Sequence, residues 1–350
     1  MSSVLLMNNG YPTGRNPSYC SYIKSMKEGL EAAGHAVSLL VLDSNFSSKR
    51  EQIFHYAKYY RQILKNNFGR FDYVLMNHYG HFAMPIKRKL LKIRQPVIHW
   101  HGEDLYPKNK FIDRFFTGTF KFLPAHTMHI APSVYYKEVI AEKLNISESK
   151  IAVSPSGGVD TTLFANDDRD FSSTVIKLGF ASSLVAEKGV DIVLQLLRKI
   201  EELEKFLQRK IELHYIYYGK QKTTYNTLLK RYDNVVCWEA MPSNKMPRFF
   251  QEIDLLLFPT IRKQESLGLV ALEAMSCGTP VIAPNAFASK EYILSGISGE
   301  LFTVNDFEDF FNKIIYALSN IRIYHPRNIV LEKYSRSSVI EFYKNYFINN

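Results

Sequence analysis

The feature that most limits the fold of this chain is a regular alternation of apolar, strand-like runs with amphipathic helical stretches. The runs are continuous in apolar residues instead of alternating with polar ones, which predicts strands that are buried on both faces. Strands of this kind form parallel sheets that are joined by helical connections. We therefore expect an α/β fold with helices on both faces of each sheet.

The alternation occurs twice along 350 residues, which suits two domains of roughly 100–200 residues each. The strand-like runs of the first series are 4–9, 36–43, 72–78, 96–100, 128–133 and 151–160. Those of the second are 174–183, 212–219, 235–239, 254–260 and 280–284. The clearest helical patterns cover 18–33, 190–206, 269–277 and 337–347.

We expect two Rossmann-like, doubly wound domains at 1–165 and 166–334, with a polar linker at 165–173. A final helix at 335–350 is expected to return to the first domain. Ligands of open α/β sheets bind outside the carboxyl ends of the strands. Two such domains facing each other would therefore form a cleft for two substrates.

The cysteines and the apolar segments bear on the compartment. Cys20, Cys237 and Cys277 show neither metal-ligand spacing nor a disulfide framework, which favours a reducing environment. The first apolar run is too short for a signal peptide, and no run of about 18 apolar residues follows. We expect a cytoplasmic protein.

Positive charge is concentrated in one segment. Residues 49–121 hold 15 Lys/Arg against 5 Asp/Glu, which equals the whole formal excess of +10. Aromatic residues lie among the bases, and Ile86, Leu90 and Ile93 share one helical face. An anionic membrane surface is one partner for such a segment, with a peripheral location on the inner face of the cell membrane. Ordinary solvated helix faces are the alternative, and nucleic acid is disfavoured because no binding motif accompanies the charge.

The most informative segment is ESLGLVALEAMSCGTPVIAP at 265–284. Gly268 allows a close turn before a helix, and the first amides of that helix would face an anion such as a diphosphate. Glu265 precedes the helix, and Glu273 lies on it among apolar residues. Because carboxylates pair well with vicinal diols, the two acids suit a sugar and a ribose.

At these residues the sequence resembles the retaining GT-B glycosyltransferases of family 4. Their signature E-x7-E has the form E-x-x-G-L-x-x-L-E-A-M-x-x-G-x-P-V-I, and this chain matches it from Glu265 to Ile282. Further resemblances lie in EGLEAAGHAVSLLVL (28–42), VIHWHGEDL (97–105), GVDTTLF (158–164), EKGVDIVLQLL (187–197) and SKEYILSGISGELF (289–302). The resemblance implies the GT-B fold and transfer of a sugar from a nucleotide-sugar.

The resemblance also implies roles for individual residues. Lys188 would contact the donor diphosphate, and a fixed cation there would stabilise the leaving group. His101 and Glu265 would contact the donor sugar, and Glu273 the ribose. His99 is expected to be structural and to point to the opposite face of its strand. The remaining implied contacts are phosphate on the amides of Gly268, Leu269 and Val270, the base near Ala240 and Met241, and the acceptor near Tyr11, Gly14 and Arg15.

One departure from the family concerns the diphosphate. The family usually has an arginine five residues before the lysine, where this chain has Ser183. Arg262 or Lys263, in a longer turn before Glu265, is the candidate replacement for the missing cation.

The resemblance implies transfer with retention, no metal and no cofactor. UDP is the favoured nucleotide, and the acceptor is expected to be a glycan or a lipid-linked saccharide of surface polysaccharide synthesis. Two alternatives stay open. One is an epimerase or phosphorylase on the same fold, and the other is a non-catalytic sugar-binding or chaperone-like partner.

Overall fold

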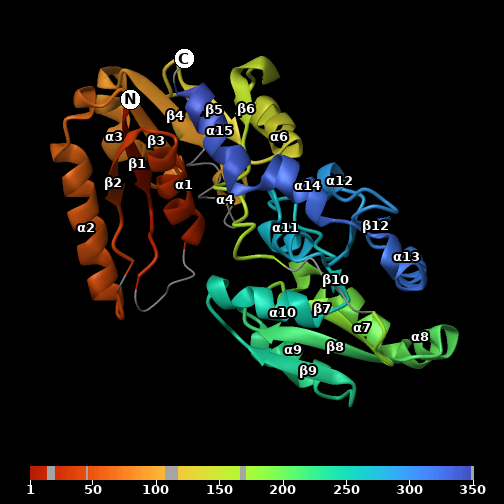
Figure 1. Cartoon of the computed structure of the whole chain (residues 1–350). Coiled ribbons are helices and arrows are strands. Elements are labelled where there is room, and N and C mark those ends of the chain that lie inside the picture. Colours follow the sequence, from red (N-terminus) through yellow and green to blue (C-terminus); the bar gives the residue numbers. More distant parts are fainter. Residues whose placement is uncertain (14–19, 45, 107–116, 166–170, 348–350) are drawn as a thin grey trace. The chain divides into compact units, whose positions relative to one another are not determined.

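The structure, a computed structural model, describes residues 1–13, 20–44, 46–106, 117–165 and 171–347. It divides into two compact units, each with its own six-stranded sheet (Figure 1). The first unit consists of Met1–Gly158 with Arg336–Asn350, and the second of Val159–Ser335.

The first sheet has the strand order β2-β1-β3-β4-β5-β6, and all its neighbouring strands are parallel. Its strands are β1 (Ser3–Asn8), β2 (Ala36–Val41), β3 (Tyr73–Asn77), β4 (Gln95–His99), β5 (Met128–Ala131) and β6 (Ile151–Val153). Leu5 and Met7 of β1 belong to one apolar cluster, and Val4 and Leu6 belong to another. The sheet is thus buried on both faces, as the continuous apolar runs predict.

Helices cover both faces of this sheet (Figure 1). Tyr59 and Ile63 of α2 (Lys49–Lys65) pack in the cluster of Leu5, whereas Met26 of α1 (Ser21–Ala32) packs in that of Val4. The other helices are α3 (Ala83–Ile86), α4 (Gly102–Leu105) and α6 (Val134–Leu144), with the 3₁₀ segments η1 (Phe68–Arg70), η2 (Tyr79–His81), η3 (Lys87–Lys92) and η4 (Glu148–Lys150).

The C-terminal helix α15 (Arg336–Tyr346) belongs to the first unit. It packs on α1, and Val339 and Tyr343 are fully buried. A Cβ atom on Gly29 of α1 would lie 3.3 Å from the Tyr343 ring, so the small residue permits the close approach. The His35 ring also lies 3.3 Å from the Tyr343 carbonyl oxygen.

The second sheet has the strand order β12-β11-β10-β7-β8-β9, and its neighbouring strands are parallel. Its strands are β7 (Val175–Phe180), β8 (Lys210–Tyr217), β9 (Val235–Glu239), β10 (Leu255–Leu257), β11 (Val281–Pro284) and β12 (Gly299–Phe302). Two six-stranded parallel sheets with helical connections confirm the expected α/β, doubly wound architecture.

The helices of the second unit are α7 (Val190–Arg198), α8 (Ile200–Leu207), α9 (Lys222–Leu229), α10 (Met246–Glu252), α11 (Leu269–Ser276), α12 (Ser289–Tyr292), α13 (Phe307–Ser319) and α14 (Arg327–Ile329), with the 3₁₀ segments η5 (Ala186–Lys188), η6 (Ser243–Lys245) and η7 (Ile321–Ile323) and the π-helical η8 (Val330–Tyr334). The prediction of a single helix over 190–206 is wrong. Lys199 leaves helical geometry (φ −108°, ψ 14°) and separates α7 from α8.

The segment Val159–Phe164, which we expected at the end of the first domain, packs within the second unit. The Val159 N–H donates to the Tyr334 carbonyl at 2.8 Å, and the Ser276 hydroxyl donates to the Phe164 carbonyl at 2.6 Å. None of the described helices combines the length and apolar character that crossing a bilayer requires.

Candidate active site

The second sheet changes its strand order between β7 and β10. From β7 the chain adds β8 and β9 on one side, and then returns to place β10 on the other side of β7. Ligands of open parallel sheets bind at the carboxyl ends of the strands at such a point, where the two loops diverge. Lys188 lies in the loop after β7, and Glu265 lies in the loop after β10.

These two loops approach each other closely at Gly189. Gly189 has a φ of 80°, and a Cβ atom there would lie only 2.0 Å from the carbonyl oxygen of Pro259. Glycine alone meets both requirements, so the residue next to Lys188 is held against the chain that leads to Glu265. A backbone hydrogen bond of 3.0 Å from Ile261 N–H to the Glu187 carbonyl joins the loops again.

Lys188 and Glu265 form an ion pair in which the ammonium donates to a carboxylate oxygen. Their side chains are only 11% and 17% exposed, so the pair is screened less than a surface pair would be. The Lys188 ammonium also lies 5.7 Å from the centre of the Phe258 ring. The predicted leaving-group cation and the predicted sugar-binding acid are therefore in direct contact.

Gly268 ends the loop after β10 and precedes α11. Its φ of 86° is left-handed, and a Cβ atom there would lie 2.6 Å from the Tyr292 hydroxyl oxygen. Both facts require glycine at this position. The first N–H groups of α11, those of Leu269 and Val270 included, have no acceptor within the helix. They form the positive end of the helix dipole, which is suited to an anion.

Glu273 lies on α11, where it is half-buried among apolar residues. Burial raises the pKa of its carboxyl from the usual 4.5 to about 8. Burial raises the pKa of the Tyr218 hydroxyl, and the charges of Glu265 and Glu273 raise it further, so the two acids share one neighbourhood. A carboxyl group whose pKa is raised as far as that of Glu273 is typical of a functional site.

The raised pKa of Glu273 gives a pH-dependent prediction. Between pH 4.5 and 8 the folded state keeps a proton that the unfolded state releases, so stability should fall as pH rises through this window. Glu273→Gln cannot ionise and should be more stable than wild type at pH 8, by on the order of 3 kcal/mol. Urea denaturation at pH 5 and pH 8 measures the difference.

Glu201→Gln is the matched control, because Glu201 is an exposed residue of α8. The free energy of unfolding of this variant should equal that of wild type at both pH values. A Glu273→Gln difference that is the same at both pH values would contradict the raised pKa.

Ser183 occupies the place at which the resembled family usually has an arginine. Its side chain forms a hydrogen bond with Tyr218, which follows the end of β8. The Leu184 N–H donates to the Tyr218 carbonyl at 2.8 Å, which joins the loops after β7 and β8. Tyr218 was not predicted from the sequence, although its place just after an apolar strand and before Gly219 was a usable signal.

The two candidate replacements for the missing cation differ in their surroundings. Arg262 is 18% exposed, and its Nε lies 3.5 Å from a Glu187 carboxylate oxygen. Its charge also lowers the pKa of the Tyr218 hydroxyl, which places it beside the two acids. Lys263 is exposed. The geometry therefore favours Arg262 as the second cation.

Ala240 and Met241, predicted near the base, follow the edge strand β9. Because the sheet is parallel, they leave it at the same end as the loops of Lys188 and Glu265. Ala240 is exposed and Met241 is half-buried.

His101 lies in the first unit, directly after β4 and before α4. Its Nε2 lies 2.8 Å from Asn77 Oδ1 at the end of β3, and its backbone N–H donates to Asp104 Oδ2 at 2.9 Å. The ring of His78 stacks on that of His101 at 5.0 Å between centres. His78 in turn forms a 2.9 Å hydrogen bond with the Tyr22 hydroxyl.

The prediction that His99 points away from His101 is wrong. Alternate residues of a strand share a face, and the two rings stack at 4.9 Å between centres. Burial lowers the pKa of His78 and of His99 to about 3, and it lowers that of His101 well below its usual value. Burial raises the pKa of Asp104 to about 8. The three imidazoles are therefore neutral at pH 7.

Of the residues predicted on the acceptor side, Gly14 and Arg15 lie outside the described residues. Tyr11 is half-buried, its carbonyl accepts a 3.3 Å hydrogen bond from the Ser44 hydroxyl, and burial raises its pKa. Within the described ranges, no group of three His, Cys, Asp or Glu side chains could hold a metal ion.

Comparison with known proteins finds a family that the second unit resembles. Residues 166–335 match the family model of the glycosyl transferases group 1. This glycosyltransferase match contains Lys188, the loop after β10 and the whole of α11. It covers the strand-order change at which the ion pair lies.

Two curated relatives extend the match into the rest of the chain. An uncharacterised 41.2 kDa protein in the cps region of Klebsiella pneumoniae is 28% identical over an alignment of 245 positions, which covers 65% of this chain and 64% of the relative. An uncharacterised glycosyltransferase of Methanocaldococcus jannaschii is 27% identical over an alignment of 256 positions, which covers 69% of this chain and 65% of the relative. The matches thus span just under two thirds of each relative.

Solved structures match the whole fold. HepE of Anabaena, in complex with UDP and glucose, has a TM-score of 0.74 at 15% identity, with all of both chains covered. Sucrose-phosphate synthase of Thermosynechococcus elongatus has a TM-score of 0.76 at 15% identity, again over all of both chains. The lipopolysaccharide outer core galactosyltransferase WaaB, in its apo form, has a TM-score of 0.70 at 14% identity, over 99% of each chain. These likenesses confirm the predicted GT-B fold.

Proposed function

We propose that the protein is a retaining glycosyltransferase of family 4 that moves a sugar from a UDP-sugar to an acceptor hydroxyl. The observation that carries the proposal is the Lys188–Glu265 ion pair beside the glycine-capped start of α11, at the strand-order change of the second sheet. Cation, acid and free helix amides at one point are the parts that a nucleoside diphosphate sugar requires.

In the proposed complex, the diphosphate accepts hydrogen bonds from the first amides of α11 and from Lys188. Glu265 keeps the lysine in place before the donor arrives and then contacts the sugar. Glu273 contacts the ribose hydroxyls, since its protonated carboxyl group can both donate to and accept from a vicinal diol. These groups would stand where a metal ion acts in other transferases, so we propose no metal and no cofactor.

The proposed reaction breaks the bond between the anomeric carbon and the diphosphate oxygen, which leaves with the electron pair. The acceptor oxygen bonds to the same carbon on the same face, and its proton passes to the departing diphosphate. Lys188 and the helix amides stabilise the charge that develops on that diphosphate. His101, kept neutral by burial, is proposed to hold a sugar hydroxyl.

The choice of UDP is supported by the structural neighbour HepE, which was solved with UDP and glucose and with UDP-glucose. A thermal-shift series with UDP and GDP tests it, because a ligand that binds only the folded state raises its apparent stability. UDP should raise the melting temperature more than GDP. The reverse order would remove UDP from the proposal.

The same assay tests the role of Arg262. Arg262→Ala should weaken UDP binding about tenfold, near the worth of a hydrogen bond to a charged group. Its neighbour Lys263→Ala removes an equal charge from an exposed side chain and should leave UDP binding near the wild-type value. Equal losses in the two variants would contradict a specific role for Arg262.

A non-catalytic sugar-binding partner is the second candidate, and the observation that favours it is Ser183. The Ser183 side chain is hydrogen-bonded to Tyr218, and it stands where the resembled family usually has an arginine. Slow release of UDP from a UDP-sugar by the purified protein distinguishes the two. Turnover supports the enzyme, whereas binding of UDP without any turnover supports the partner.

We further propose a glycan or lipid-linked saccharide of surface polysaccharide synthesis as the acceptor, met at an anionic membrane surface. Exposed apolar side chains on the first unit lie among bases of the 49–121 segment, with Met84 51% and Leu91 84% exposed beside Arg88 and Lys92. Apolar side chains within a basic surface are typical of proteins that bind the interface of anionic bilayers.

Vesicle flotation tests the membrane proposal. The protein should float with vesicles that contain phosphatidylserine and remain unbound with neutral phosphatidylcholine, and Leu91→Asp should reduce flotation several-fold. Equal binding to both vesicle types, or to neither, would contradict it.

A further inference from the structure

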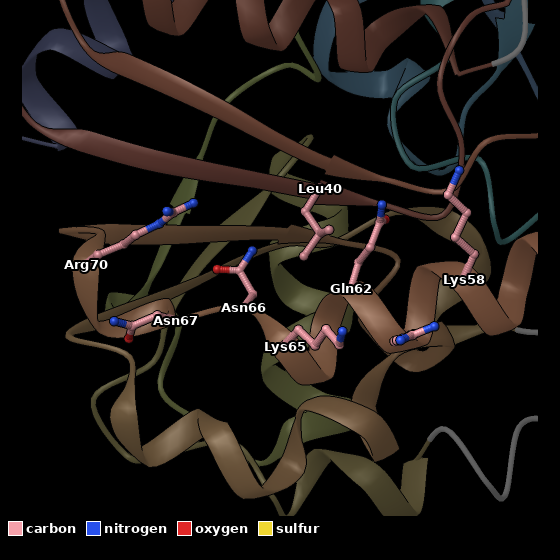
Figure 2. Close-up of a pocket in the computed structure, with 8 residues that line it drawn as sticks. Leu40, Lys58, Gln62, Lys65, Asn66, Asn67 and Arg70 are labelled. Carbon is pink, nitrogen blue, oxygen red and sulfur yellow. The ribbon is translucent and has the colours of Figure 1, made fainter.

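A basic groove lies on the first unit, between the edge strand β2 and helix α2. Its volume is about 640 Å³. Its lining consists of Leu40, Lys58, Arg61, Gln62, Lys65, Asn66, Asn67 and Arg70. Figure 2 shows Lys58 and Arg70 at opposite ends, with Gln62 and Asn66 between them.

The local sequence accounts for the groove. Helix α2 begins after Ser48, whose hydroxyl accepts from the Glu51 N–H at 3.2 Å. Tyr59 and Ile63 fix one stripe of the helix in the core. Side chains at 58, 61, 62 and 65 follow helical spacing on a different stripe, which is left outside the core and lines the groove.

Among the residues that the structure describes, no acidic side chain neutralises the charge of the groove. Lys58, Arg61 and Lys65 are exposed, and no described carboxylate forms an ion pair with any of them. Arg70 lies over the Phe71 ring, 4.7 Å from its centre, and likewise has no acidic partner among the described residues. Four cations without a counter-charge favour an anionic ligand.

The amides of the groove narrow the chemistry of that ligand. Gln62, Asn66 and Asn67 can donate and accept hydrogen bonds, which suits hydroxyl groups. Cations with amides fit a molecule that carries both charge and hydroxyls.

The length and shape of the groove exclude simpler ligands. Lys58 and Lys65 are seven residues apart on the helix, or about 10 Å along its axis, which is longer than a single phosphate needs. The lining comes from side chains of α2 and the segment after it, with Leu40 alone from β2, so an added peptide strand is disfavoured. A membrane surface is disfavoured as the ligand, because membrane-binding surfaces present apolar side chains to the bilayer, whereas this groove is lined mainly by polar side chains.

We propose that this groove binds an anionic saccharide chain, with its carboxylate or phosphate groups on the cations and its hydroxyls on the amides. The groove shares no residue with the proposed donor site, to which the first unit contributes His101. The inference rests on the proposed function in one respect, namely that the protein handles saccharides.

Isothermal titration calorimetry at low salt tests the proposal with two probes of equal length, oligogalacturonate and a neutral malto-oligosaccharide. Oligogalacturonate should bind and the neutral probe should not. Arg61→Gln with Lys65→Gln should weaken oligogalacturonate binding at least tenfold. Lys230→Gln with Arg231→Gln removes one lysine and one arginine from exposed positions of the second unit, and should change oligogalacturonate binding less than threefold.

Three results would overturn the proposal. The first is an equal loss of oligogalacturonate affinity in the two double variants, and the second is binding of the neutral malto-oligosaccharide as tight as that of oligogalacturonate. The third is binding of neither saccharide while phosphatidylserine vesicles bind through Arg61 and Lys65. Arg61 and Lys65 are exposed, so their double variant should fold, and unchanged circular dichroism checks this. No donor is present in the titration. Loss of saccharide binding with intact UDP release would therefore reject the groove alone, and the reverse would reject the transferase alone.

Discussion

Lys188→Ala should lower the rate of UDP release from the donor by about 100- to 1,000-fold, the range for loss of one preorganised donor to a developing negative charge. Lys188 is 11% exposed and in contact with Glu265, so water cannot replace it cheaply. The variant should also leave Glu265 without its counter-ion, which should weaken donor binding less than it weakens the rate. Steady-state kinetics, with kcat and KM reported separately, measure both effects.

Lys199→Ala is the matched control for this variant. Lys199 is another paired lysine of the second unit, with its ammonium 2.9 Å from a Glu308 carboxylate oxygen, but its side chain is 37% exposed. Its loss should change the rate less than twofold. If Lys188→Ala kept more than a third of the wild-type rate, the lysine would have no role in leaving-group stabilisation.

Gly189→Ala should destabilise the second unit by on the order of 3 kcal/mol, since a left-handed φ and a steric clash add their costs. The new Cβ atom would lie 2.0 Å from the Pro259 carbonyl oxygen, and backbone cannot move aside as a flexible side chain can. Separation of the two loops should also pull Lys188 away from Glu265. Urea denaturation measures the loss of stability.

Gly296→Ala separates the cost of a left-handed φ from the cost of a steric clash. Gly296 has a φ of 77°, close to that of Gly189, but a Cβ atom there would meet nothing within 4 Å. The control should lose about 1 kcal/mol from its backbone alone. Equal losses at Gly189 and Gly296 would show that the close approach to Pro259 contributes nothing.

Much of the fold could be predicted, because strands buried on both faces leave continuous apolar runs in the sequence. The resemblance implied that Lys188 and Glu265 both contact the donor, but their direct ion pair, between residues 77 apart in the chain, was not predicted. The break at Lys199 could not be predicted, because the apolar stripe continues across it from α7 to α8. Tertiary packing determines where such a helix breaks, and the spacing of apolar residues in the sequence does not indicate it.

The sequence was weaker where several loops combine. Tyr218 enters the site through a hydrogen bond to Ser183 that only the neighbouring loops bring about. The stack of His78, His99 and His101 needed two strands to lie side by side, and our assignment of His99 to the opposite face misapplied the strand period. Strand spacing, read correctly, would have placed His99 beside His101.

The central claim is that the loop after β10 and the start of α11 receive a diphosphate between Glu265 and Glu273. A crystal structure of the protein with UDP tests it most directly. We predict density for the diphosphate within hydrogen-bond distance of the Gly268–Val270 amides and of the Lys188 ammonium. UDP bound elsewhere, with the amides at the start of α11 covered by protein atoms, would contradict the claim.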